Sequence, residues 1–171
     1  MDHFAKPDYE LVIAQDAGRL HRNFHCYSTH KGYDLVAMGV SSISKVGNTY
    51  SQNAKTLEEY YAFIDGGELP IIKGISLTAD DLLRREATQR LTYDFALEFK
   101  AFEQNTGVSF AGYFSEELEM LVDLEQDGLL TLTKDSIRIE PRGRLLVRNI
   151  CMTFDTSLRS SKMENRFSRV V

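Results

Sequence analysis

The segment that decides the fold is GRLLVRNICMTFD, residues 143–155. Its apolar run is interrupted by Arg144 and Arg148, and Pro141 precedes it where proline suits the first turn of a helix. The apolar side chains do not share one helical face, so the pattern predicts a helix buried on more than one side. Buried cations need partners, which predicts a helix between a core and something anionic. A core helix whose arginine side chains extend to water explains the same pattern without a ligand.

The charges of the chain are unevenly distributed around this segment. Residues 138–171 hold eight Lys or Arg and three Asp or Glu. The other 137 residues hold twelve Lys or Arg and twenty-two Asp or Glu. A cationic end on an anionic body suggests an anionic ligand, a nucleic acid, or the chain's own acidic surface as its partner.

Length and composition exclude several classes of protein. The 171 residues, 43% of them hydrophobic, suit one domain or one small domain with an extension. No apolar run approaches the roughly 20 residues that span a bilayer, and the acidic N-terminus has no signal-peptide pattern. The two cysteines, Cys26 and Cys151, form no metal or disulfide motif. We therefore expect a cytoplasmic protein with no membrane partner.

Three histidines within ten residues, His21, His25 and His30, raise the question of a metal site. The neighbouring residues favour strand and loop over helix, and no carboxylate or cysteine completes a zinc pattern. The sequence therefore predicts no metal ligand here.

The order of elements predicts an α+β fold. Capping-box patterns begin helices at Thr56 and Thr78, and LLTLTKDSIRIE, residues 129–140, is typical of a β-hairpin. An apolar residue recurs every four positions from Leu83 to Phe95, as in a core-facing helix. The expected helices cover about 57–64, 79–99, 110–126 and 143–155, with an extended connector over 70–77. Helices, hairpin and a further helix suggest a winged-helix-like arrangement in the C-terminal part.

Five motifs together resemble a known family. They are MDHFA (1–5), GRLHRNF (18–24), DLVAMGVSSIS (34–44), GRLLVRNICMTFD (143–155) and FSRVV (167–171). From end to end the chain resembles the C-terminal third of the oxygen-independent coproporphyrinogen III oxidases, which are radical S-adenosylmethionine enzymes of haem synthesis.

The resemblance implies a function and a division of the chain. Members of the family convert two propionates of coproporphyrinogen III to vinyl groups, using S-adenosylmethionine and a [4Fe–4S] cluster held by a CxxxCxxC loop. This chain has no such loop, and a cluster needs several thiolates. We expect a C-terminal portion, inactive and cofactor-free by itself, whose partners are the N-terminal barrel and coproporphyrinogen III. Residues 1–65 would close the radical-SAM barrel and residues 66–171 would form a mostly helical domain that covers the substrate.

The resemblance also implies site residues. Phe24 and Ile43 match positions that line the S-adenosylmethionine site, Phe24 as an apolar wall and Ile43 largely through its backbone. Because arginine pairs bidentately with carboxylates, we expect Arg144, Arg148 and Arg169 to bind propionates or close the substrate site. No catalytic residue is expected in this chain. The alternative is a stand-alone degenerate relative that binds a ligand or nucleic acid through its winged-helix-like part, although the overall acidity disfavours nucleic acid.

Overall fold

The computed structural model describes residues 5–22, 27–29 and 33–156. It divides into two compact units, residues 1–82 and residues 83–171. Both contain helices and small antiparallel sheets, so the α+β class is confirmed. Within the described residues, no helix has the length and apolarity that crossing a bilayer requires.

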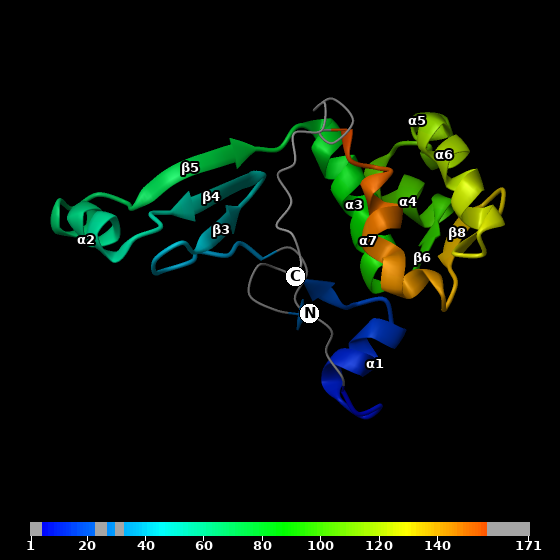
Figure 1. Ribbon diagram of the computed structural model, residues 1–171, viewed down its shortest axis with the longest axis horizontal. Coiled ribbons are helices and arrows are strands. Elements are labelled where there is room, and N and C mark those ends of the chain that lie inside the picture. The colour runs from blue at the N-terminus through cyan, green and yellow to red at the C-terminus, as the bar shows by residue number, and fades with distance from the viewer. Residues whose placement is uncertain (1–4, 23–26, 30–32, 157–171) are drawn as a thin grey trace. The chain divides into compact units, whose positions relative to one another are not determined.

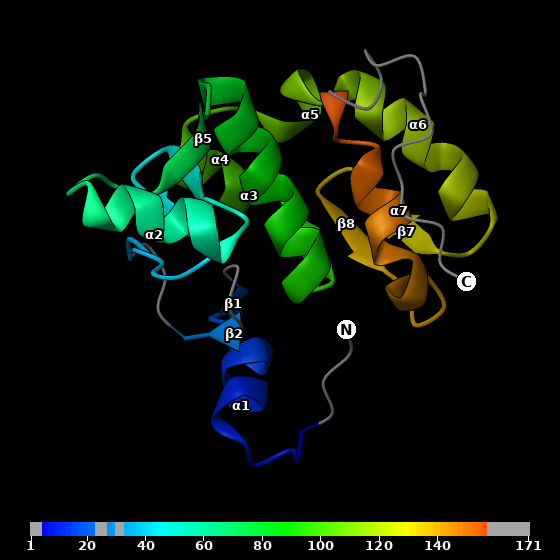
Figure 2. The ribbon, with the colours of Figure 1, turned by 60° about the vertical axis from the view of Figure 1, so that its left-hand side comes forward.

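The first unit contains two antiparallel sheets. β1 pairs with β2, and a separate sheet has the order β3–β4–β5. α1 precedes β1, and α2 connects β4 to β5 (Figures 1 and 2). The elements are α1 Glu10–Asp16, β1 His21–Arg22, β2 Tyr27–Ser28, β3 Ile43–Val46, β4 Thr49–Asn53, α2 Leu57–Asp65 and β5 Ile71–Ser76.

The second unit holds most of the helix α3, which begins in the last residues of the first unit, and the antiparallel sheet β6–β8–β7. α3 and α7 lie side by side in both views of the ribbon (Figures 1 and 2). The elements are α3 Ala79–Tyr93, β6 Ala96–Glu98, α4 Phe99–Thr106, α5 Phe110–Tyr113, α6 Ser115–Gln126, β7 Leu130–Leu132, β8 Ser136–Ile139, the 3-10 helix η1 Gly143–Leu146 and α7 Val147–Met152.

Phenylalanines form the centre of the second unit. Phe99 stacks on Phe110 with ring centroids 4.6 Å apart, and Phe114 meets Phe154 edge to face at 5.5 Å. Aromatic side chains bury large apolar areas, and such ring pairs stabilise beyond that area. The other buried members come from α3, the sheet, α4, α6 and α7: Ala87, Leu91, Leu97, Phe102, Leu121, Leu130, Ile137, Ile139 and Ile150.

The predicted local signals at helix and hairpin ends are confirmed. The Thr56 hydroxyl accepts from the Glu59 N–H at 3.3 Å, and the Thr78 and Asp81 side chains each accept from the other's backbone N–H. The expected hairpin is β7 and β8, paired antiparallel from Leu130–Ile139 to Leu132–Ile137. Gly128, with φ of 70°, follows the end of α6 as expected.

Three predicted helices are divided or shortened. The helix expected over 79–99 ends at Tyr93, because Phe95 adopts a left-handed φ of 52° and residues 96–98 pair with β8. The helix expected over 110–126 is two helices that meet at Phe114, whose side chain enters the core. The helix expected over 143–155 is the 3-10 helix η1 followed by α7, which ends at Met152. In the first two cases tertiary packing or pairing outweighs local helix periodicity. The connector expected over 70–77 is extended, as predicted, and forms strand β5, paired with β4.

The boundary between the compact units lies at Leu82–Leu83, inside α3. The division expected from the resemblance, residues 1–65 and 66–171, concerns the barrel of the complete enzyme and stays a prediction.

Candidate functional site

The loop before β3, residues 37–42, lies next to the predicted cofactor residue Ile43. Ile43 is half-buried, begins β3 and pairs with Gln52 of β4. β3 and β4 are joined by the two-residue turn Gly47–Asn48, and the Gly47 N–H donates to Asp34 Oδ1 at 2.7 Å. Gly47 has a φ of 56°, which suits the tight hairpin turns that require glycine. Phe24, the other predicted cofactor residue, lies outside the described residues.

Backbone conformations in this loop are unusual. Gly39 has a φ of 104°, and Ser41, which has a side chain, has a φ of 58°. Non-glycine residues enter the left-handed region rarely and persist there only when surrounding contacts hold them. The Ser41 N–H donates to the Ala54 carbonyl at 2.7 Å, and the Gln52 amide donates to the Ser41 carbonyl at 3.1 Å.

Two side chains from neighbouring elements hold the loop. Asn53, only 5% exposed at the end of β4, donates its amide to the carbonyls of Ala37 at 3.3 Å and Gly39 at 2.9 Å. From α2, the Tyr60 hydroxyl accepts from the Gly39 N–H at 3.1 Å. The sequence analysis missed both residues, because no local pattern distinguishes them.

The arginine-bearing segment in the second unit is attached to the core along one side. Ile150 and Phe154 are buried, and a Cβ added at Gly143 would overlap the Leu129 carbonyl oxygen. Glycine therefore permits the start of η1 to approach the backbone that enters β7. In contrast, Leu145 is 89% exposed and Met152 is 45% exposed. The prediction that this segment is buried on more than one side is wrong within the described chain.

The two described candidate arginines have different surroundings. The Arg144 guanidinium lies 4.6 Å from the centroid of the Phe95 ring, a cation–π contact. Arg148 is exposed on α7 and forms no ion pair with any residue that the structure describes. Arg169 lies outside the described residues. The structure therefore places Arg144 and Arg148 on one segment, and only Arg148 is without a described contact for its charged group.

A buried ion pair joins three elements of this unit. Arg84 of α3 donates to Glu117 of α6 at 2.9 Å and to the Phe154 carbonyl after α7 at 3.1 Å. The Glu117 side chain is 4% exposed, and Arg84 also lies over the Phe114 ring at 5.4 Å. Glu117 follows Phe114 by three positions and precedes Leu121 by four, so its carboxylate lies on the apolar stripe of the helix. This position in the sequence could have indicated that Glu117 is buried and paired.

The described residues do not include a group of side chains suited to hold a metal cluster. Among those described, no three His, Cys, Asp or Glu side chains are grouped to hold a metal ion. Cys151 is half-buried beside Thr92 Oγ1 at 3.5 Å, and burial raises the pKa of its thiol, although the Thr92 contact opposes this. An iron–sulfur cluster is held by several thiolates, so Cys151 by itself does not provide a cluster site.

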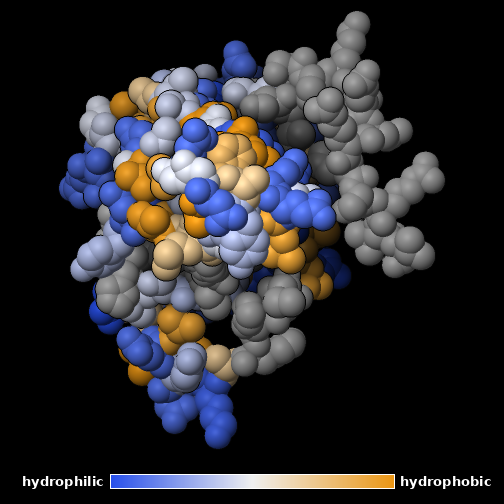
Figure 3. All heavy atoms as spheres, turned by 90° about the vertical axis from the view of Figure 1, so that its left-hand side faces the viewer, coloured by the Kyte–Doolittle hydropathy of each residue, from blue (hydrophilic) through white to orange (hydrophobic). Residues whose placement is uncertain are grey.

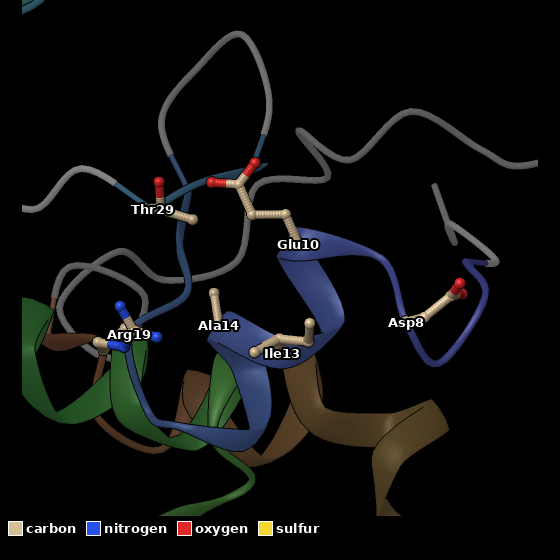
Figure 4. Close-up of a pocket in the computed structure, with 6 residues that line it drawn as sticks. All are labelled: Asp8, Glu10, Ile13, Ala14, Arg19 and Thr29. Carbon is tan, nitrogen blue, oxygen red and sulfur yellow. The ribbon is translucent and has the colours of Figure 1, made fainter.

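A hollow of about 380 Å³ lies beside α1. Its lining contains Arg19, Asp8 and Glu10 together with smaller and apolar side chains, and Figure 4 shows Thr29 and Arg19 on the side away from Asp8. Cation and carboxylates are both present, so the lining favours neither an anion nor a cation, and we assign it no function.

Comparison with known proteins indicates the class of protein to which this chain is similar. Residues 77–146 match the family model of the HemN C-terminal domain. This range includes β6–β8 and the Arg84–Glu117 pair, and it ends at η1.

The chain as a whole matches longer enzymes. It is 47% identical over 171 residues to the oxygen-independent coproporphyrinogen III oxidase of Salmonella typhimurium and 46% identical to that of Escherichia coli, covering all of this chain and 37% of each relative. The Synechocystis enzyme is 44% identical over 175 residues. The solved coproporphyrinogen III oxidase (HemN) of E. coli, described as a radical SAM enzyme, aligns with a TM-score of 0.88 and 46% identity over 92% of this chain and 36% of that one.

The recognition made from the motifs is therefore confirmed. The chain corresponds to the C-terminal portion of the oxygen-independent coproporphyrinogen III oxidase family. It spans little more than a third of the length of these relatives.

Proposed function

We propose that this chain completes the active site of an oxygen-independent coproporphyrinogen III oxidase. The observation that carries the proposal is the end-to-end similarity, 46–47% identical to oxidases of that name with all of this chain aligned. The complete enzyme would decarboxylate two propionates of coproporphyrinogen III and form vinyl groups in haem synthesis. The [4Fe–4S] cluster would be held by cysteines outside this sequence, so residues 1–171 would be inactive by themselves.

In this proposal the first unit contributes to the S-adenosylmethionine site. When bound in the complete enzyme, S-adenosylmethionine supplies the radical chemistry. Ile43 would present its backbone to the cofactor, and Phe24 would add an apolar wall. The small residues before Ile43 support this role, because glycine and serine let a ligand approach the backbone closely. The β3–β4–β5 sheet would extend the barrel formed by the N-terminal portion of the complete enzyme.

The second unit would cover the substrate. Its order of helix, strand, three further helices and two strands supports a winged-helix-like description. Arg148 is the leading candidate for a propionate ligand, because it is exposed and its charge has no ion-pair partner among the described residues. Arg144 would contribute from its position over Phe95, and Arg169 from the C-terminal end. A covering domain would also keep water from reactive intermediates.

The test is replacement of Arg148 by Ala in the complete oxidase, with Arg138→Ala as the matched control. Arg138 is also exposed, but it lies on β8 and is not a candidate substrate ligand. Loss of one charge-assisted carboxylate contact is expected to cost roughly 1.5–3 kcal/mol of binding, seen as a higher KM for coproporphyrinogen III. Unchanged kinetics in both variants would refute the role of Arg148.

The topology also favours a second candidate, a nucleic-acid-binding winged helix, and the charge of α6 counts against it. The helix has no Lys or Arg and carries five carboxylates, Glu116, Glu117, Glu119, Asp123 and Glu125. A helix in a nucleic-acid groove must approach phosphates, for which cations are required. Salt-dependent binding of duplex DNA by the chain would reverse this judgement.

A further inference from the structure

We infer that Asn53 is a positioning residue for the S-adenosylmethionine site, because its buried amide holds the loop that leads into Ile43. The inference rests on the proposed function, in which this loop and Ile43 contact the cofactor. Neither Asn53 nor its helper Tyr60 would touch the cofactor itself.

The Asn53 amide is the centre of the contacts. Its Nδ2 has two N–H donors, and the carbonyls of Gly39 and Ala37 accept at 2.9 and 3.3 Å. The Asn53 backbone N–H also donates to the Ser42 carbonyl at 2.9 Å. One residue therefore contacts the loop at three points between Ala37 and Ser42. A side chain that is 5% exposed cannot replace these contacts with bulk water without moving.

A bulge in the neighbouring sheet lies at the same residue. Gln52 pairs with Lys73 and Asn53 pairs with Ile71, so Ile72 is an extra residue on β5. Bulges change the direction of a strand and often occur beside active sites. Here the bulge lies at Asn53, the residue of β4 whose side chain donates to the carbonyls of the loop. The Ala54 N–H then donates to the Pro70 carbonyl, and the Ala54 carbonyl accepts from the Ser41 N–H.

The loop needs this support because its backbone is strained. Ser41 stays at a φ of 58° although it has a side chain, and such a conformation persists only when surrounding contacts determine it. Tyr60 of α2 accepts from the Gly39 N–H at 3.1 Å, so both backbone polar groups of Gly39 are bound. Loss of either contact would let the loop relax and would misplace the backbone that precedes Ile43.

The test uses three variants of the complete oxidase. Asn53→Ala removes both side-chain donors, and Tyr60→Phe removes one hydroxyl and keeps the ring. Tyr61→Phe is the matched control, since it removes the hydroxyl of the neighbouring α2 tyrosine, which is 56% exposed, and keeps its ring. We expect the KM for S-adenosylmethionine to rise about tenfold in Asn53→Ala and about threefold in Tyr60→Phe, with the KM for coproporphyrinogen III unchanged. The control should leave both KM values unchanged.

Hydrogen exchange separates failure of this inference from failure of the proposed function. In the wild-type enzyme, S-adenosylmethionine is expected to protect the amides of residues 37–46. If it does not, the cofactor role of the loop is refuted, and this inference is refuted with it. If protection occurs but Asn53→Ala leaves the KM for S-adenosylmethionine unchanged, Asn53 is not a positioning residue. An equal rise of both KM values in Asn53→Ala would indicate a general structural effect and would also overturn the inference.

Discussion

The two units differ in how they bury apolar side chains. In the second unit, thirteen buried hydrophobic residues form one cluster that contains five phenylalanines. In the described part of the first unit, the buried hydrophobic residues are Ala14, Leu20, Ala37 and Ala54. Burial of large side chains is the main stabilising contribution to a fold. The second unit therefore has a core of its own, whereas the first depends on hydrogen bonds and short sheets.

Exposed side chains show the same contrast. α2 has no buried residue, and Leu57, Tyr61 and Ile64 lie along one exposed stripe of it. Every residue of β5 is exposed, including Ile71, Ile72 and Ile75. Figure 3 faces this part of the chain and shows hydrophobic patches between hydrophilic ones. A unit with so many exposed large apolar residues fits a protein segment that is completed by other surfaces.

The largest expected effect is the replacement of a ring in the aromatic core. Phe114→Ala should destabilise the second unit by roughly 3–5 kcal/mol, because Phe114 is fully buried against Phe110 and Phe154. Ile75→Ala, at a residue that is 58% exposed, should cost well under about 1 kcal/mol. Hydrogen exchange of α6 and β4 amides measures each unit separately. Equal losses in the two variants would contradict the contrast between the units.

The next effect concerns the buried ion pair. Arg84→Ala leaves the Glu117 carboxylate buried without this partner, at a cost of roughly 2–3 kcal/mol. The double variant Arg84→Met with Glu117→Leu should recover much of this loss, because an apolar pair needs no desolvation of charge. Urea unfolding of both proteins tests the prediction. A double variant that is less stable than Arg84→Ala would contradict this prediction.

A smaller effect compares the two helix caps. Thr56→Ala and Thr78→Ala each remove a side-chain acceptor from a helix start, a loss of about 1 kcal/mol. α2 buries no residue, whereas α3 contributes Ala87 and Leu91 to the core. We therefore expect faster amide exchange throughout α2 in Thr56→Ala, but only in the first turn of α3 in Thr78→Ala. Exchange spreading to residue 91 in Thr78→Ala would contradict this.

The smallest effect is a pH dependence at Cys151. Burial raises the pKa of this thiol above its ordinary value of 9.0, with the Thr92 contact opposing the shift. The folded unit prefers the neutral thiol, so this contribution to stability is complete below pH 9.0 and is lost as the pH rises through the folded pKa. The free energy of unfolding of the wild type and of Cys151→Ala, measured at pH 7 and pH 10, isolates the contribution of this thiol, because the other groups titrate alike in the two proteins. The stability difference between them should shift against the wild type at pH 10; a constant difference would contradict the prediction.

The candidate site was only partly accessible from the sequence. The resemblance predicted Ile43 as a cofactor residue, and the bidentate pairing of arginine with carboxylates predicted Arg144 and Arg148 as substrate residues. These roles stay predictions, and the structure describes all three residues. Asn53 was not identified, since its role depends on carbonyls sixteen and fourteen positions earlier in the chain. Glu117 was not identified either, although its place on an apolar stripe was a usable signal.

By itself the sequence determined the features that depend on neighbours within about ten residues. The caps at Thr56 and Thr78, the glycine after α6 and the β7–β8 hairpin all follow from local hydrogen bonding and turn geometry. The family motifs also belong to the sequence alone.

The tertiary structure decided where those local preferences were overruled. The helix predicted to continue past Tyr93 ends there because β8, some forty residues later, pairs with β6. Leu145 is exposed although its neighbourhood is apolar, because Gly143 brings η1 against Leu129 and the segment directs Ile150 and Phe154 into the core instead. Pairing and packing involve residues far apart in the chain, and their free energies outweigh the small differences in local propensity.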